Sequence, residues 1–195
     1  LSLEVLAQSG LRAGDGLDAA RLDDLRHQEA RHDALASALR LLSYRPRSEA
    51  ELRQRLARRG APPPIVQQTI DRLRELGLVD DEGFARSWVE SRDQASPRSR
   101  RLLASELRAK GVARPDADTA VASVDDEDAA YRAGQRRART VAGLPWPDFQ
   151  RRLSGFLLRR GFGYETVRTA VARLWQETAP AAAAGADEAK PAAES

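Results

Sequence analysis

The chain has 195 residues, of which 42% are hydrophobic and only 5% aromatic, and this suits thin helical units better than one thick globule. It contains no cysteine and no methionine, so the composition excludes a disulfide framework and thiolate metal ligands. No apolar run approaches the roughly 20 residues that cross a bilayer, and no signal peptide is visible. We therefore expect a cytoplasmic protein with no membrane partner.

The formal net charge of +3 is unevenly distributed along the chain. Residues 33–177 carry +7, whereas residues 1–32 and 178–195 carry −2 each. Nearly all the cations are arginines, whose planar forks suit phosphate and carboxylate groups. A GC-rich genome also enriches arginine and alanine, so this composition alone does not assign the cations a function.

The N-terminal segment divides into an irregular part and a helical part. Residues 1–16 contain Gly10, Gly14 and Gly16 and are predicted to be an irregular lead-in. Leucines at near-helical spacing over residues 18–44 predict one long helix or two shorter ones.

The next segment predicts two helices joined by a stiff turn. Ser48 and Glu51 have the spacing of a capping box, in which each side chain binds the other residue's backbone N–H. Gly60 ends this helix, the prolines at 62–64 form the turn, and a second helix covers residues 65–75.

A second group of helices follows after Asp80 and Asp81, which are suited to capping the first of them. A polar loop is expected at residues 92–97. Ser99 then begins a helix that Gly111 ends, and another helix is expected at residues 116–124.

A third group begins near Asp125, and a turn at residues 143–147 separates its first helix from helices at 148–160 and 164–177. Pro147 marks the first turn of the middle helix. Residues 178–195 are mostly alanine with proline and a few charges, so we expect a disordered tail.

One phrase occurs in all three groups. It ends in Gly60, Gly111 or Gly161, with leucines eight and four residues earlier and a cation immediately before. Self-similarity at fixed spacing indicates one supersecondary unit used three times. We therefore predict an all-α fold, a tandem array of three three-helix modules that forms an elongated, curved rod. The predicted divisions are an N-terminal segment at 1–32, modules at 33–79, 80–124 and 125–177, and the tail at 178–195.

The repeated glycines are interpreted as structural helix stops, because glycine readily adopts the left-handed conformation there. The cations before them, Arg59, Lys110 and Arg160, have two compatible interpretations. The helix dipole favours a cation in a last turn by about 0.3–1 kcal/mol. The same helix ends could instead line a basic strip that binds an anionic partner.

Arginines also cluster on successive modules. Cations at a helix start oppose the dipole, so the first cluster is not explained by local helix stability and favours an external anion. A solvated helical face is the alternative for any single cluster. The candidate binding residues are Arg98, Arg100, Arg101, Arg108, Lys110, Arg136, Arg137, Arg151, Arg152, Arg159 and Arg160.

No catalytic or metal site is predicted. The acidic residues at 80–81 and 125–128 lie at helix starts, where capping explains them better than a nuclease centre does. His27 and His32 are five residues apart, so they do not share a helical face as zinc ligands four apart would. The three tryptophans are interpreted as packing residues, with base stacking as the alternative. We expect no enzyme activity and no cofactor.

These phrases resemble those of the RecX family of recombinase modulators, over about residues 33–177. The resemblance lies in the stretches ALRLL (38–42), RSEAEL (47–52), GLVDD (77–81), ELRAKGV (106–112) and FLLRRGF (156–162). It implies tandem three-helix modules and a monomer that binds the RecA protein and the RecA–single-stranded DNA filament, with weak direct DNA binding as an addition. It further implies a negative regulator that limits filament growth, strand exchange, ATP hydrolysis and co-protease activity in DNA repair and the SOS response.

Two other functions remain open from the residues alone. A free-standing DNA-binding protein could be built from tandem helix-turn-helix units, but its middle helices offer few Asn or Gln side chains for reading bases. A scaffold whose positive charge is only compositional is the third alternative.

Overall fold

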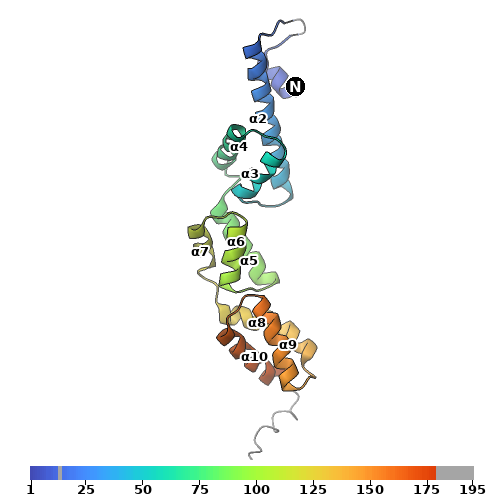
Figure 1. The fold of residues 1–195 in the computed structure, drawn as a ribbon, viewed down its shortest axis with the longest axis vertical. Helices are drawn as coiled ribbons and strands as arrows, with labels where there is room; N and C mark the ends of the chain where they lie inside the picture. Colours follow the sequence, from blue (N-terminus) through green and yellow to red (C-terminus); the bar gives the residue numbers. More distant parts are fainter. Residues whose placement is uncertain (13–14, 179–195) are drawn as a thin grey trace, which may run out of the picture. The chain divides into compact units, whose positions relative to one another are not determined.

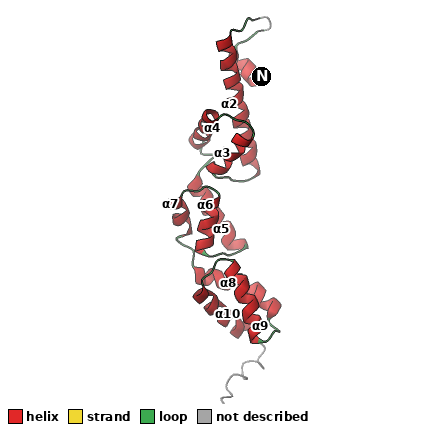
Figure 2. Ribbon diagram, in the orientation of Figure 1, coloured by secondary structure: helices red, strands yellow, loops and turns green. Residues whose placement is uncertain are grey.

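The computed structural model describes residues 1–12 and 15–178, and every regular element in this part is a helix (Figures 1 and 2). The described chain therefore confirms the all-α fold. It forms two compact units, which are described separately. The first contains Leu1–Ala85 and Ala109–Asp116, and the second contains Arg86–Arg108 and the chain from Ala117 onward.

The first unit begins with a short helix that the sequence analysis missed. Residues 1–16 were expected to be irregular, but α1 (Leu3–Ser9) is helical and buries Val5. Ser2 caps it by accepting a hydrogen bond from the Val5 N–H, and the Ser2 N–H donates to the Glu29 carboxylate on α2 at 2.7 Å. Gly10 ends the helix in the left-handed conformation (φ 68°). The Ser2 cap, the left-handed Gly10 at the end and the contact with α2 together stabilise α1, which is too short to persist alone.

The following helix, α2 (Ala19–Tyr44), is a single continuous element, which decides between the two alternatives for residues 18–44. Asp18 caps it, and it packs with α3 (Glu49–Arg58) and α4 (Pro63–Glu75) around one apolar core (Figure 1). We call this set the first module. The last helix begins two residues earlier than predicted, because the fixed φ of proline suits a first helical turn.

Only one of the two hydrogen bonds of the expected capping box at Ser48 is present. The Ser48 hydroxyl accepts from the Glu51 N–H at 3.2 Å, but the Glu51 carboxylate does not return the bond. It pairs instead with Arg45, Arg47 and Arg55. Partial burial opposes ionisation of Glu51, yet the guanidiniums of Arg45 and Arg47 outweigh it and lower the pKa of Glu51. Charged partners hold a carboxylate more strongly than a neutral amide does.

The second module consists of α5 (Asp81–Ala95), α6 (Arg100–Ala109) and α7 (Arg114–Val121). The polar loop predicted at 92–97 is shorter than expected, because α5 continues to Ala95. The last helix begins and ends earlier than the predicted 116–124. Within the second unit, the Trp88 indole N–H on α5 donates to Glu106 on α6 at 3.1 Å.

The third module packs α8 (Asp126–Val141), α9 (Trp146–Arg159) and α10 (Tyr164–Thr178) together (Figure 1). Phe149 is fully buried and contacts Trp146 and Trp175, which confirms a packing role for these two tryptophans. The last helix includes Thr178, and the tail predicted for 178–195 otherwise lies outside the described residues.

The repeated leucines form the core as predicted. At both repeat positions in all three modules they are no more than 1% exposed: Leu52, Leu56, Leu103, Leu107, Leu153 and Leu157.

A joint within the first unit binds the start of α3 to residues far along the chain. The Ser48 hydroxyl donates to the backbone carbonyl of Lys110, and the Glu49 N–H donates to the Asp81 carboxylate at 2.8 Å. Gly111 lies so close to Ala50 that a Cβ built on it would be 2.1 Å from the Ala50 Cβ. The α6–α7 turn therefore satisfies the Ser48 hydroxyl, and the first residue of α5 satisfies a backbone N–H at the start of α3.

The second unit contains the same joint in a second copy. The Ser99 N–H donates to the Arg160 carbonyl at 3.0 Å, and the Arg100 N–H donates to Asp126 at 2.7 Å. A Cβ on Gly161 would lie 2.5 Å from the Ser99 hydroxyl, whereas a Cβ on Gly60 would meet nothing within 4 Å. The repeat thus includes a means of joining consecutive modules, in addition to the helices themselves.

This difference between glycines predicts two levels of destabilisation. Gly60 and Gly111 share a left-handed backbone (φ 86° and 82°), so alanine at either should cost about 1–2 kcal/mol of unfolding free energy. Gly111→Ala should cost about 1–3 kcal/mol more, because its new methyl group overlaps Ala50. Chemical denaturation followed by circular dichroism measures both, and equal losses would contradict the steric role of Gly111.

The carboxylate of Asp81 should make the stability of the folded state depend on pH. Burial raises the pKa of Asp81, so its ionised form weakens the folded state above that pKa and the cost disappears on acidification. Asp81→Asn keeps an acceptor for the Glu49 N–H. It should therefore be more stable than the parent at neutral pH, by a margin that shrinks on acidification and is lost below pH ~4, the pKa of an unfolded Asp. Melting temperatures across this range test it, and Asp81→Ala, which lacks the acceptor, should lose stability at every pH.

Candidate anion-binding site

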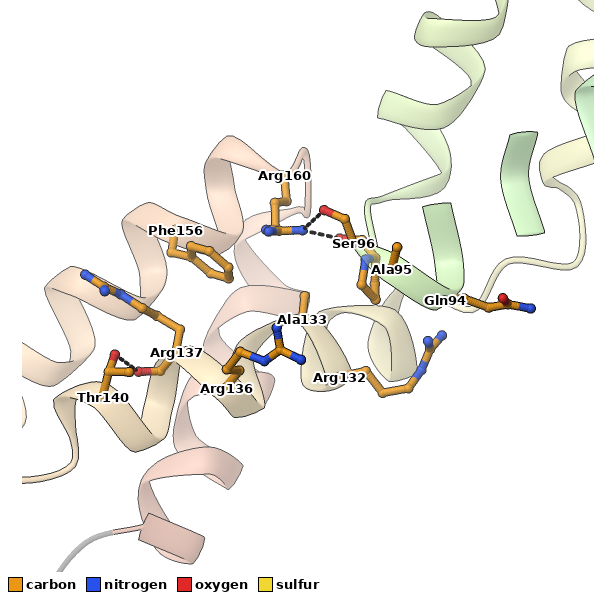
Figure 3. Close-up of a pocket in the computed structure, with 11 residues that line it drawn as sticks. Gln94, Ala95, Ser96, Arg132, Ala133, Arg136, Arg137, Thr140, Phe156 and Arg160 are labelled. Carbon is orange, nitrogen blue, oxygen red and sulfur yellow. Dashed lines mark hydrogen bonds between the residues drawn. The ribbon is translucent and has the colours of Figure 1, made fainter. Parts of the chain in front are cut away.

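A cleft of about 390 Å³ in the second unit brings four arginines together (Figure 3). It lies among the end of α5 with its following loop, α8 and α9. Arg132, Arg136 and Arg137 extend from α8, and Arg160 follows α9. No Asp or Glu lines the cleft; its other lining residues are Gln94, Ala95, Ser96, Pro97, Ala133, Thr140 and Phe156.

Arg160 is held in this cleft by neutral acceptors alone. Its guanidinium donates to the Ser96 hydroxyl at 2.7 Å and to the Pro97 carbonyl at 3.0 Å, and it lies 4.5 Å from the centre of the Phe156 ring. Partial burial and the nearby charge of Arg98 lower the pKa of Arg160. A partly desolvated cation without a carboxylate partner is favourably placed to receive an anion.

Arg132 differs because protein carboxylates already neutralise much of its charge. It donates to Asp93 at 2.7 Å and to Asp128 at 2.6 Å, and the bond to Asp93 is the main cause of its raised pKa. The sequence analysis did not select Arg132. Its position four residues before Arg136, on the same helical face, is the signal that could have identified it.

Arg136 and Arg137 are exposed, and neither guanidinium has a hydrogen bond or ion pair within residues 1–12 and 15–178. Both were predicted as binding residues, as was Arg160. The structure therefore places three of the predicted residues around one cleft and supplies neighbours that the sequence did not reveal.

A second group lies along α6 and α7, where Arg100, Arg101 and Arg108 line a shallower cleft together with Asp118 and Asp126. The Arg100 guanidinium donates to the Val124 carbonyl at 2.7 Å. This internal partner accounts for a cation at a helix start, so the dipole argument no longer favours an external anion at Arg100. Arg101 has no polar partner in the described chain.

The remaining predicted residues are not gathered into one site by either unit. Arg98 pairs with Glu106, which is also the partner of Trp88, so an internal carboxylate satisfies it as well. Arg151 pairs with Asp148, whereas Arg152 and Arg159 have no polar partner among the described residues. Lys110 belongs to the first unit, where its carbonyl accepts from Ser48.

The acidic residues at helix starts bind backbone amides. Asp80 accepts from the Glu82 N–H at 3.0 Å, and Asp125 accepts from the Glu127 N–H at 2.9 Å. Their predicted capping role is confirmed. In the part of the chain that the structure describes, no three His, Asp or Glu side chains are grouped so that they could hold a metal ion.

The chain is a tandem array of three-helix modules, and one cleft in it is lined by four arginines. Three family models match it in order, described as the first, second and third three-helix domains of RecX, at residues 34–73, 80–121 and 125–171. The chain belongs to the RecX family, whose curated members are named regulatory proteins.

Two of these relatives are the regulatory protein RecX of Thermobifida fusca and that of Chlorobium limicola. The first is 39% identical over 77% of this chain and 83% of the relative. The second is 33% identical over 75% of this chain and 92% of the relative.

Solved structures agree on the fold. A crystal structure of regulatory protein RecX matches with a TM-score of 0.69 at 22% identity, covering 86% of this chain and 85% of that one. RecX from Lactobacillus salivarius matches with a TM-score of 0.65 at 21% identity, covering 75% and 97% of the two chains. None of the helices in residues 1–12 and 15–178 has the length and hydropathy needed to span a lipid bilayer.

Proposed function

We propose that this chain is a non-catalytic negative regulator of the RecA recombinase. It binds RecA or the RecA–single-stranded DNA filament and limits filament growth, strand exchange, ATP hydrolysis and co-protease activity. Membership of a family of regulatory proteins supports this assignment. In this proposal the protein acts in the cytoplasm as a monomer, and the predicted module boundaries at 79/80 and 124/125 separate its binding units.

One observation in the structure carries the proposal. Five of the eleven predicted binding cations are unpaired within the described chain and are available to an external anionic surface: Arg101, Arg136, Arg137, Arg152 and Arg159. A filament on DNA presents phosphates and carboxylates repeatedly along its length. Several weak contacts from one chain gain avidity once the first has formed, because the later contacts are intramolecular. Occupying the filament in this way would block subunit addition.

Charge reversal in the cleft tests the proposal. Arg136→Glu with Arg137→Glu should weaken inhibition of RecA ATP hydrolysis at least about tenfold, as expected when attraction between close charges becomes repulsion. The matched control is Arg139→Glu with Arg168→Glu, which changes the net charge equally on exposed positions of α8 and α10 outside the cleft. Equal inhibition by both double variants would contradict the assignment of this surface.

Two other predicted binding cations, Arg101 in the second unit and Lys110 in the first, give a separate prediction. Arg101→Glu with Lys110→Glu should weaken filament inhibition without changing helix content, because neither substitution removes a core residue or the backbone bonds of the joint. Circular dichroism and the ATPase assay measure the two quantities. Affinity for duplex DNA with no effect on RecA would favour a free-standing DNA-binding protein instead.

A further inference from the structure

We propose that the turn between α3 and α4 is a docking site for the N-terminus of a helix of another protein, one whose helix begins with serine or threonine. The site is a pocket of about 170 Å³ in the first unit, and its lining includes Ala30, Asp33, Arg59 and Gly60. The inference goes beyond the proposed function, because it depends neither on RecA nor on the arginine cleft.

The positions that form this pocket bind a helix start elsewhere in the chain. Three residues of the second module hold the start of α3 through a carboxylate, a backbone carbonyl and a steric contact: Asp81, Lys110 and Gly111. The first two modules share one residue register at an offset of 51. The equivalent residues of the first module, which all line the pocket, are Ala30, Arg59 and Gly60. The third module holds the start of α6 in the same manner.

The backbone of the turn has the conformation of an occupied copy. Arg59 and Arg160 both have a φ of −88°, with ψ of 3° and 5°, and Gly60 and Gly161 both have a φ of 86°. A Cβ on Gly161 would overlap the helix start that the turn holds, whereas a Cβ on Gly60 would meet nothing within 4 Å. The turn therefore has the shape of the joint before a helix reaches it.

Two acceptors at the pocket have no partner in the described chain. The N–H groups of Gly60 and Ala61 bind carbonyls within α3, and residues 62–64 are prolines, so the following backbone has no donor for the Arg59 carbonyl. The Asp33 carboxylate is exposed and makes no hydrogen bond or ion pair within residues 1–12 and 15–178. It lies one helical turn after Ala30 on the same side of α2, so it supplies the negative charge that the equivalent position lacks.

These two acceptors select the start of a helix as the ligand. A helix N-terminus presents backbone N–H groups that have no partner within the helix, together with the positive end of the helix dipole. A serine or threonine at its first position can donate its hydroxyl to the Arg59 carbonyl, as Ser48 does to the Lys110 carbonyl. An N–H of the first turn then donates to Asp33, as the Glu49 N–H does to Asp81.

A second copy of this chain does not offer such a helix start. Ser48 and Ser99 are already engaged in the two joints. The equivalent position in the third module is Phe149, which is fully buried and has no hydroxyl. Ser2, which caps α1, donates to Glu29 instead. The occupant that the pocket fits is therefore a different protein.

The start of α3 itself provides the probe, as a synthetic peptide of residues 45–59 with a staple near its C-terminus, because isolated helices of this length are marginal. The peptide is titrated into the full ¹⁵N-labelled chain, and amide resonances are followed by NMR. The resonances of Gly60 and Ala61 should shift saturably. The resonance of Gly111 should not shift, because the chain's own α3 already holds that turn.

Changes on both sides of the contact test its chemistry. Replacing the peptide's Ser48 by alanine should weaken binding about fivefold, while threonine should retain it, and circular dichroism establishes that the peptides are equally helical. Asp33→Lys should weaken binding about tenfold, because the charge at the helix N-terminus is reversed. Asp24→Lys is the matched control: it makes the same charge change at an exposed position of α2 outside the pocket, and it should leave the affinity within about twofold.

Four results would overturn the inference. The first is no shift of Gly60 or Ala61 at about 1 mM peptide. The second is equal binding of the serine and alanine peptides, and the third is an equal loss in the Asp33 and Asp24 variants, which would reduce the contact to non-specific charge. The fourth is a dimer of the chain in sedimentation velocity that Asp33→Lys dissociates, because it would assign the pocket to a second copy.

Discussion

The fold depends on how the first turn of each middle helix is satisfied. The first backbone N–H groups of a helix have no partner within it, and leaving such a donor buried and unpaired costs about 1–3 kcal/mol. In both units the donors are bound by residues about 30 to 60 positions further along the chain. Glycine at the contact allows the two backbones to approach, as the positions of Gly111 and Gly161 show. The start of one helix and the end of another are thus stabilised together.

The joint between Ser99 and Arg160 in the second unit also forms part of the arginine cleft. Arg160 contributes its carbonyl to the Ser99 N–H and its guanidinium to Ser96 and Pro97, so one residue serves both the joint and the cleft. Arg132 adds a second connection by reaching from α8 to Asp93 on α5. These contacts fix the walls from which Arg136 and Arg137 extend. The unpaired cations therefore lie on a framework that is already rigid, which limits the entropy a ligand must overcome.

The sequence predicted the helices well, because leucine periodicity and glycine stops are local signals. Leu103 and Leu107 could be assigned to a core from spacing alone, and their burial confirms it. The errors had two different causes. Glu51 pairs with arginines four and six residues away instead of with the Ser48 N–H, so a local ion pair prevailed over the capping box. Helix α1 depends on a contact with Glu29, 27 residues after Ser2, and a single sequence does not indicate such a pairing.

In the candidate site too, the sequence did not indicate which cations have partners within the protein. Arg100 and Arg136 are equally basic in the sequence, yet one binds the Val124 carbonyl and the other binds no described residue. Spacing indicated that cations cluster on each module. Whether a given cation is consumed internally depends on which carbonyl or carboxylate the tertiary structure brings within about 3 Å of it. For this reason Arg98 and Arg100 have internal partners that the sequence did not suggest, while Arg132 was missed.

The cations that precede the repeated glycines show how far a repeat specifies function. Each lies at a helix end, where the dipole favours positive charge, and in this respect the positions are equivalent. The hydrogen-bond partners of these cations differ. Arg59 donates to Ser37 on α2, whereas Arg160 donates to Ser96 and Pro97 beside three further arginines. The repeat therefore determines where the backbone turns, and the neighbours determine what the side chain does. A binding surface on such an array need not repeat with its helices, and the surface proposed for the second unit lies where the end of α9 meets the loop after α5.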